Sequence, residues 1–213
     1  MEIHIWSDVV CPFCYLGKRR FEHVLAEFEH RDEVQVVHRA FQLDPSAPKD
    51  KTFDQVELLT KKYGMPAEQF AAQHAELTRQ GRTEGIEYNF AGGRAGNTFD
   101  AHRLVRLGLD RGLQDVVIDR FFRAHFTEQR SVFEADSLVA LAVEAGLDPD
   151  EARNVLTEEK YTEEIHADAA QAQAYGANGV PFFVLDQRYG ISGAQPREAF
   201  EQTLTKAWAD HAG

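Results

Sequence analysis

The sequence predicts an α/β fold in which the two ends of the chain form one compact domain, with a long helical segment inserted between them. Three patterns support this prediction: a strand–helix–strand order near the N-terminus, a helical pattern from about residue 45 to 159, and a hairpin followed by a helix near the C-terminus. We therefore assign residues 1–44 and 160–213 to the α/β domain and residues 45–159 to the insertion.

The N-terminal segment begins with the alternation of a strand and then changes to the spacing of a helix. Residues 2–6 place two isoleucines on one strand face. From residue 12 to about residue 29, apolar side chains recur in steps of three and four, and Pro12 suits the first helical turn because no N–H is needed there. A second strand follows at residues 34–41, so the two strands are expected to be parallel, with a right-handed crossover.

The middle of the chain carries helix-start signals. Residues 97–100 resemble a capping box, and residues 148–151 combine a capping Asp, a Pro and an acid. The glycine-rich residues 92–96 are expected to form a loop, because they follow no convincing strand and lack the G-x-G spacing of a phosphate-binding turn.

The C-terminal part returns to strands after one more helix at residues 161–175. The apolar run 180–185 predicts a buried strand, and residues 189–193 predict a second strand that completes a hairpin. A last helix is expected from about residue 196 to 209.

Composition and charge restrict the class of protein. Hydrophobic residues make up 43% and charged residues 27% of the chain, which is typical of a globular protein. The net charge of −12 disfavours nucleic acid and anionic membranes as partners. The mean hydropathy is −0.44, and no apolar run approaches the roughly 20 residues of a spanning helix. The N-terminus shows no signal peptide, so we expect a cytoplasmic protein.

The two cysteines of the chain, Cys11 and Cys14, favour redox chemistry. A disulfide across two intervening residues closes a very short loop and stabilises little, so a structural bridge is not expected. No second Cys-x-x-Cys and no suitably spaced His pair is present to complete a zinc site, so we expect no metal. Thiol–disulfide exchange is the remaining use of such a pair in a reducing compartment.

The order of elements resembles the thioredoxin fold with a DsbA-type all-helical insertion. Cys-x-x-Cys stands at the first strand-to-helix junction, and Val180-Pro181 stands just before the third strand. The likeness extends over three segments, SDVVCPFCYLG (7–17), NTFDAHRL (97–104) and GANGVPFF (176–183). Over essentially its whole length the chain resembles the FrnE-like branch of DsbA-family thiol–disulfide oxidoreductases.

The spacing of the two cysteines suggests a role for each. Cys11 is expected at the N-terminal cap of the first helix, where free backbone N–H groups and the helix dipole favour a thiolate. Cys14 lies one turn further and is expected to be less exposed, so we assign Cys11 as nucleophile and Cys14 as resolving thiol. Pro12 and Phe13 are candidates for tuning the motif and for contacting substrate, although each also has a purely structural explanation.

The resemblance also assigns a role to Val180 and Pro181. Only about 5–6% of X–Pro bonds are cis, so the residues alone predict a trans bond. The resemblance implies a cis Pro181 that faces the cysteines, and a Val180 backbone that binds an extended substrate. Asp8 is expected to stabilise the turn before the motif, with assistance to proton movement at Cys14 as the alternative.

The predicted function is therefore thiol–disulfide exchange with protein or small-molecule substrates, glutathione among them, without a cofactor. Two alternatives stay open. One is a glutathione-dependent isomerase or transferase of the same superfamily, similar to 2-hydroxychromene-2-carboxylate isomerases and kappa-class transferases, which typically carry Ser at the place of Cys11. The other is a non-enzymatic holdase.

Overall fold

The computed structural model describes residues 1–64 and 66–213, which divide into two compact units. The first unit comprises Met1–Leu43 and Glu163–Gly213, and the second comprises Asp44–Thr162. The sequence predicts that the α/β domain ends at residue 44 and resumes at residue 160. The first unit is an α/β unit and the second is mainly helical, which is the fold class expected of a thioredoxin-like fold with a helical insertion.

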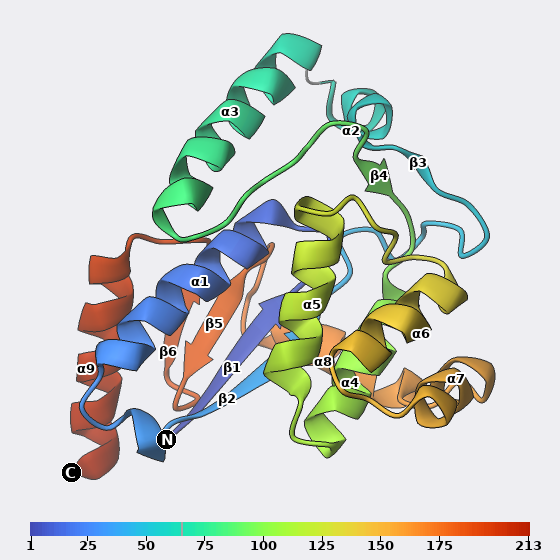
Figure 1. The fold of residues 1–213 in the computed structure, drawn as a ribbon. Helices are drawn as coiled ribbons and strands as arrows, with labels where there is room; N and C mark the ends of the chain where they lie inside the picture. The colour runs from blue at the N-terminus through green and yellow to red at the C-terminus, as the bar shows by residue number, and fades with distance from the viewer. Residues whose placement is uncertain (65) are drawn as a thin grey trace. The chain divides into compact units, whose positions relative to one another are not determined.

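A four-stranded mixed sheet forms the centre of the first unit, in the order β2-β1-β5-β6 (Figure 1). Strand β1 pairs parallel with β2 and antiparallel with β5, and β5 pairs antiparallel with β6. The strands are β1 (Glu2–Ser7), β2 (Gln35–Ala40), β5 (Phe182–Leu185) and β6 (Tyr189–Ser192). Because β5 is antiparallel to β1, with Phe182 opposite Trp6, the residues just before β5 lie beside those just after β1.

Helices cover both faces of this sheet. On one face, Ile3 and Ile5 pack with Phe21 of α1 and Phe200 of α9. On the other face, Trp6 packs with residues that include Ala172 of α8. The alternation of side chains along β1 therefore separates two apolar layers. The helices of this unit are α1 (Pro12–Glu27), the short 3-10 helix η1 (Arg31–Glu33), α8 (Thr162–Ala174) and α9 (Arg197–Ala212).

One buried carboxylate, that of Asp168 on α8, attaches this helix to the sheet. Its Oδ2 accepts a hydrogen bond from the Ala40 N–H at 2.9 Å, and its Oδ1 accepts one from the Arg39 guanidinium at 3.2 Å. The Asp168 carbonyl also accepts a hydrogen bond from Trp6 Nε1 at 2.8 Å. The charge of Asp168 is therefore paired and hydrogen-bonded, as a carboxylate with only 8% exposure requires.

The second unit is helical except for a small two-stranded ladder, in which Phe53 pairs with Ala95 and Asp54 with Arg94. This ladder corrects the expectation of an all-helical insertion with a loop at residues 92–96, and pairing over only two residues leaves no periodic pattern from which to predict it. The elements are β3 (Phe53–Asp54), α2 (Gln55–Tyr63), α3 (Ala67–Thr83), β4 (Arg94–Ala95), α4 (Phe99–Asp110), α5 (Gln114–Phe126), α6 (Ala135–Glu144) and α7 (Pro149–Thr157).

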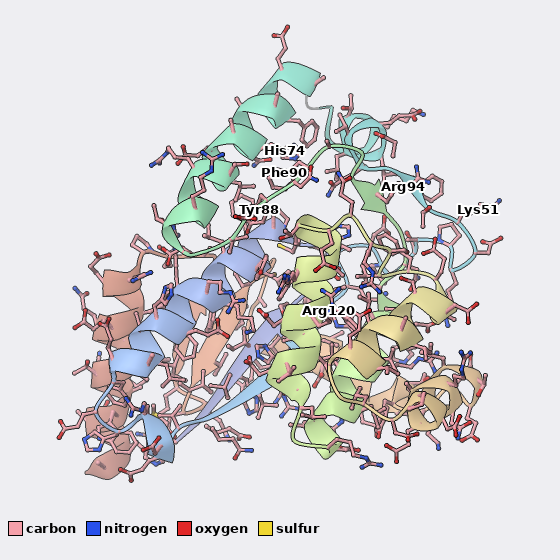
Figure 2. The ribbon with its side chains drawn as sticks, viewed as in Figure 1. Lys51, His74, Tyr88, Phe90, Arg94 and Arg120 are labelled. Atoms are coloured by element: carbon pink, nitrogen blue, oxygen red, sulfur yellow. The ribbon has the colours of Figure 1, made fainter. Side chains whose placement is uncertain are left out.

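Aromatic rings order the segment that follows α3. His74 stacks on Phe90 with ring centroids 4.1 Å apart, and Phe90 stacks on Tyr88 at 5.1 Å; all three are labelled in Figure 2. Burial lowers the pKa of His74, so its ring is neutral in this stack at pH 7. The stack gives residues 88–90 a packed position although they belong to no helix or strand.

In residues 1–64 and 66–213, no helix combines the length and the apolar character that crossing a bilayer requires.

Replacing Asp168 tests whether its carboxylate stabilises the packing of α8 on the sheet. We expect Asp168→Asn to lower the free energy of unfolding by about 1–3 kcal/mol, because an amide group has one oxygen fewer to offer two buried donors. Thermal denaturation followed by circular dichroism measures the loss. The matched control is Glu164→Gln, an exposed residue on the same helix. Equal melting temperatures for the two variants would contradict this assignment.

Candidate active site

Cys11 lies where the chain leaves β1 and begins α1. The turn closes with a hydrogen bond from the Cys11 N–H to the Asp8 carbonyl at 3.0 Å, and Cys11 is the N-cap residue of α1 with an extended backbone. Pro12 occupies the first helical position, where its missing N–H is not needed. The Cys11 side chain therefore lies at the N-terminus of α1, which is the positive end of the helix dipole.

The first turn of α1 contains no acidic side chain. Every other α-helix in the described part of the chain carries at least one Asp or Glu in its first turn, as in Asp148–Glu151 of α7. An acid there would oppose a negative charge on the sulfur. In a chain with a net charge of −12, this helix therefore keeps its N-terminus available to an anion.

Cys14 lies one turn further along α1 and is a buried free thiol, with 1% exposure against 4% for Cys11. Burial raises the pKa of the Cys14 thiol well above its ordinary value, and the neighbouring Cys11 sulfur raises this pKa further. Cys14 is consequently a neutral thiol at pH 7, which is the state expected of a resolving cysteine before its turn to react.

The segment before β5 meets the first cysteine. The Cys11 thiol donates a hydrogen bond to the Val180 carbonyl, with 3.7 Å between sulfur and oxygen. The Val180–Pro181 peptide bond is cis. The Pro181 carbonyl accepts a hydrogen bond from the Gly193 N–H at 2.8 Å. The structure therefore brings together Cys11, Cys14, Val180 and Pro181 from two segments that lie far apart in the sequence.

The remaining residues of the motif and its turn have distinct positions. Phe13 is exposed at 38%, whereas Asp8 is buried at 1%. The Asp8 carboxylate accepts a hydrogen bond from the Leu43 N–H at 2.8 Å, and this contact together with its carbonyl bond to Cys11 accounts for a turn-stabilising role.

The basic residues that follow Cys14 in α1 are engaged elsewhere. Lys18 and Arg19 form ion pairs with Glu22, and Arg20 donates to the Ala194 carbonyl at 2.7 Å. Lys18 is buried, although a basic run on a helix is usually a solvated face. The burial of Lys18 could not be predicted from the sequence, because it depends on which face of α1 is covered.

Asn97 belongs to the second unit and has a structural role there. Its side-chain oxygen accepts a hydrogen bond from the Phe99 N–H at 2.9 Å, and its side-chain nitrogen donates to the Ala47 carbonyl at 2.7 Å. The Asn97 side chain thus supports the turn before α4, whereas the N-cap residue of this helix is Thr98, one position later than the capping-box pattern at residues 97–100 predicts.

Comparison with known proteins identifies the family. The model of the DSBA-like thioredoxin domain matches residues 2–205. The crystal structure of the probable DsbA oxidoreductase SCO1869 from Streptomyces coelicolor is 50% identical, with a TM-score of 0.94 over 98% of this chain and 90% of that chain. The uncharacterized protein YwbO from Bacillus subtilis (strain 168) is 26% identical over 208 residues, which is 96% of each chain.

A more distant structure shares the fold. The cytosolic disulfide reductase DsbM from Pseudomonas aeruginosa, solved with GSH, is 19% identical, with a TM-score of 0.66 over 98% of this chain and 100% of that chain. The match of the family model over nearly the whole sequence, together with a cysteine pair at the start of α1, leads to one conclusion: this chain belongs to the family of DSBA-like thioredoxin domains.

Proposed function

We propose that this protein exchanges thiols and disulfides through Cys11 and Cys14, with protein or small-molecule disulfides as substrates. One observation carries the proposal: Cys11 caps α1, with Cys14 one turn away and the Val180 carbonyl 3.7 Å from the Cys11 sulfur. The DSBA-like family supports redox activity of this general type.

Cys11 makes the first attack. Its thiolate attacks one sulfur of the substrate disulfide, the substrate S–S bond breaks, and the departing thiolate takes a proton from solvent. The product is a mixed disulfide between Cys11 and the substrate. The N-terminus of α1, which has no acid in its first turn, stabilises the attacking anion.

Cys14 completes the exchange. Its raised pKa keeps it protonated while Cys11 reacts, which separates the two roles. After losing its proton, Cys14 attacks the Cys11 sulfur and releases the second substrate thiolate. The substrate gains two electrons and the protein holds a Cys11–Cys14 disulfide. The same steps in reverse oxidise a dithiol substrate, with the direction set by the relative reduction potentials.

Substrate binding is assigned to the Val180 backbone beside Pro181. Among the described residues, no hydrogen-bond partner faces the Val180 N–H, and the carbonyl of the same residue points to the Cys11 sulfur. An extended peptide can pair with such a backbone while its disulfide reaches Cys11. The exposed ring of Phe13, two residues after Cys11, offers an apolar contact to substrate, and Pro12 tunes the motif by leaving no N–H donor at the first helical position.

The cellular setting belongs to the same proposal. We place the protein in the cytoplasm, as the sequence predicts, and include glutathione among its substrates. The comparison with DsbM, a cytosolic disulfide reductase solved with GSH, supports both points. Membership of the FrnE-like branch stays a prediction.

Replacing each cysteine in turn separates the two roles. We expect Cys11→Ser to abolish reduction of insulin disulfides, because a hydroxyl does not attack a disulfide at neutral pH. Serine is also a good N-cap residue, so the variant should keep its fold. Cys14→Ser should instead accumulate a mixed disulfide with the substrate, detected by mass spectrometry. Insulin reduction by Cys11→Ser at the wild-type rate would exclude the proposed function.

The raised pKa of Cys14 predicts the pH dependence of the second step. Burial raises the pKa of Cys14 whether or not Cys11 is in a mixed disulfide, and only a thiolate attacks, so below this pKa the resolution rate should rise about tenfold per pH unit. A thionitrobenzoate mixed disulfide on Cys11 allows the measurement, because resolution releases the coloured thiolate. Cys14→Ser serves as control and should release none. A plateau below pH 8 would contradict the assignment of Cys14.

A further inference from the structure

Gly17 lies in the interior of α1, where glycine is unfavourable. A glycine inside a helix costs about 1 kcal/mol relative to alanine. The backbone of Gly17 is not left-handed, so its conformation is open to any residue. The reason for glycine at this position must therefore be the space around it.

The space beside Gly17 is closed on three sides. A Cβ placed there would lie 3.0 Å from Pro181 Cγ, 3.4 Å from Phe183 Cζ and 3.5 Å from Ala194 Cα. These atoms come from the segment before β5, from β5 itself and from the segment after β6. The contact with Pro181 is shorter than nine in ten real Cβ contacts, so an added methyl group must displace a neighbour by a few tenths of an ångström.

The neighbours of Gly17 are held in place by hydrogen bonds. The Pro181 carbonyl accepts from the Gly193 N–H at 2.8 Å, and the Ala194 carbonyl accepts from the guanidinium of Arg20 at 2.7 Å. Arg20 lies on the same helix as Gly17, so α1 is hydrogen-bonded to the segment after β6 close to Gly17. A methyl group at Gly17 would therefore strain these contacts or move the helix.

The same helix contacts the two consecutive residues Val180 and Pro181. Its N-cap residue, Cys11, reaches the Val180 carbonyl, and Gly17 lies against the Pro181 ring. The depth at which α1 packs on Pro181 consequently sets the separation of the Cys11 sulfur from the Val180 carbonyl. At 3.7 Å this contact has little margin, because a further displacement of a few tenths of an ångström would weaken it.

We propose that Gly17 is a positioning residue for disulfide exchange: the absence of a side chain lets α1 pack directly on Pro181 and holds the Cys11 sulfur beside the Val180 backbone, where an extended disulfide substrate binds. The inference rests on the proposed function. It assigns Gly17 an effect on reactions that require docking at Val180, and none on the intrinsic reactivity of the Cys11 thiol.

Gly17→Ala separates these two effects. Since a misplacement of 1 Å can cost about 100-fold in rate, a shift of a few tenths should slow reduction of a peptide disulfide by about 3- to 10-fold. Alkylation of Cys11 by iodoacetamide at fixed pH requires no docking and should stay within about twofold of wild type. If helix propensity alone mattered, Gly17→Ala would be more stable than wild type and would reduce the peptide disulfide at the wild-type rate.

Gly108→Ala in α4 is the matched control. Its Cβ would lie 3.0 Å from Gln114 Cα and 3.1 Å from Val117 Cγ2, so the substitution is more crowded than Gly17→Ala but belongs to the second unit. We expect it to change the melting temperature without slowing peptide-disulfide reduction. Slowing in both variants to the same extent would overturn the positioning role of Gly17, because general destabilisation would then explain the loss.

A double variant keeps the test valid if Gly17→Ala folds poorly. Gly17→Ala combined with Pro181→Ala lacks the Cγ atom that the new methyl group meets. The added cost of Gly17→Ala, measured by thermal denaturation, should be smaller in the Pro181→Ala background than in wild type. Equal costs in the two backgrounds would overturn the inference.

The outcomes for Gly17 are distinct from those for the proposed function. A wild-type protein that does not reduce disulfides would remove the function itself. A wild-type protein that is active, with a Gly17→Ala variant that reduces peptide disulfides at the same rate, would remove only the positioning role. Parallel losses in peptide reduction and alkylation would also remove it, because the substitution would then act on the thiol.

Discussion

The active site depends on the antiparallel pairing of β1 with β5. Strand β1 ends just before the turn that leads to Cys11, and β5 begins just after Pro181, opposite Trp6. This register brings two segments that are far apart in the sequence together at the same end of the two central strands. The contact of Cys11 with the Val180 carbonyl follows from it, and so does the packing of α1 on Pro181. If β5 ran parallel to β1, Val180 and Pro181 would lie at the other end of the strands, away from the cysteine pair.

Local patterns in the sequence were sufficient for most elements and for the cysteines. The periodicity of the first helix, the position of Pro12 and the two-residue spacing of the cysteines predicted an N-cap Cys11 and a Cys14 less exposed than Cys11, because these features depend on neighbouring residues only. The burial of both thiols was not predicted, because it depends on the segments that cover them. The nearness of Val180 and Pro181 to Cys11 was anticipated through resemblance, since hydrophobic patterns do not specify which distant strands pair or in which register.

Features that depend on packing between distant segments were not predictable. Asp168 stands in a helix otherwise rich in alanine and acids, and nothing in its surroundings indicates that its carboxylate is buried against Ala40. Gly17 was visible as a glycine inside a predicted helix, a signal that a close approach is needed, but the identity of the approaching residue comes only from the fold. The missing acid in the first turn of α1 was readable from the sequence once all helix starts were compared.

Asp168 also affects how the chain accommodates its inserted unit. The chain leaves the α/β unit shortly after Ala40 and returns shortly before Asp168, and these two residues are hydrogen-bonded to each other. The points at which the chain leaves and re-enters the α/β unit are therefore linked by a hydrogen bond within that unit. Loop-closure entropy grows only slowly with the length of the enclosed segment. The inserted segment can thus differ in length at little entropic cost, because the α/β unit keeps its own closure.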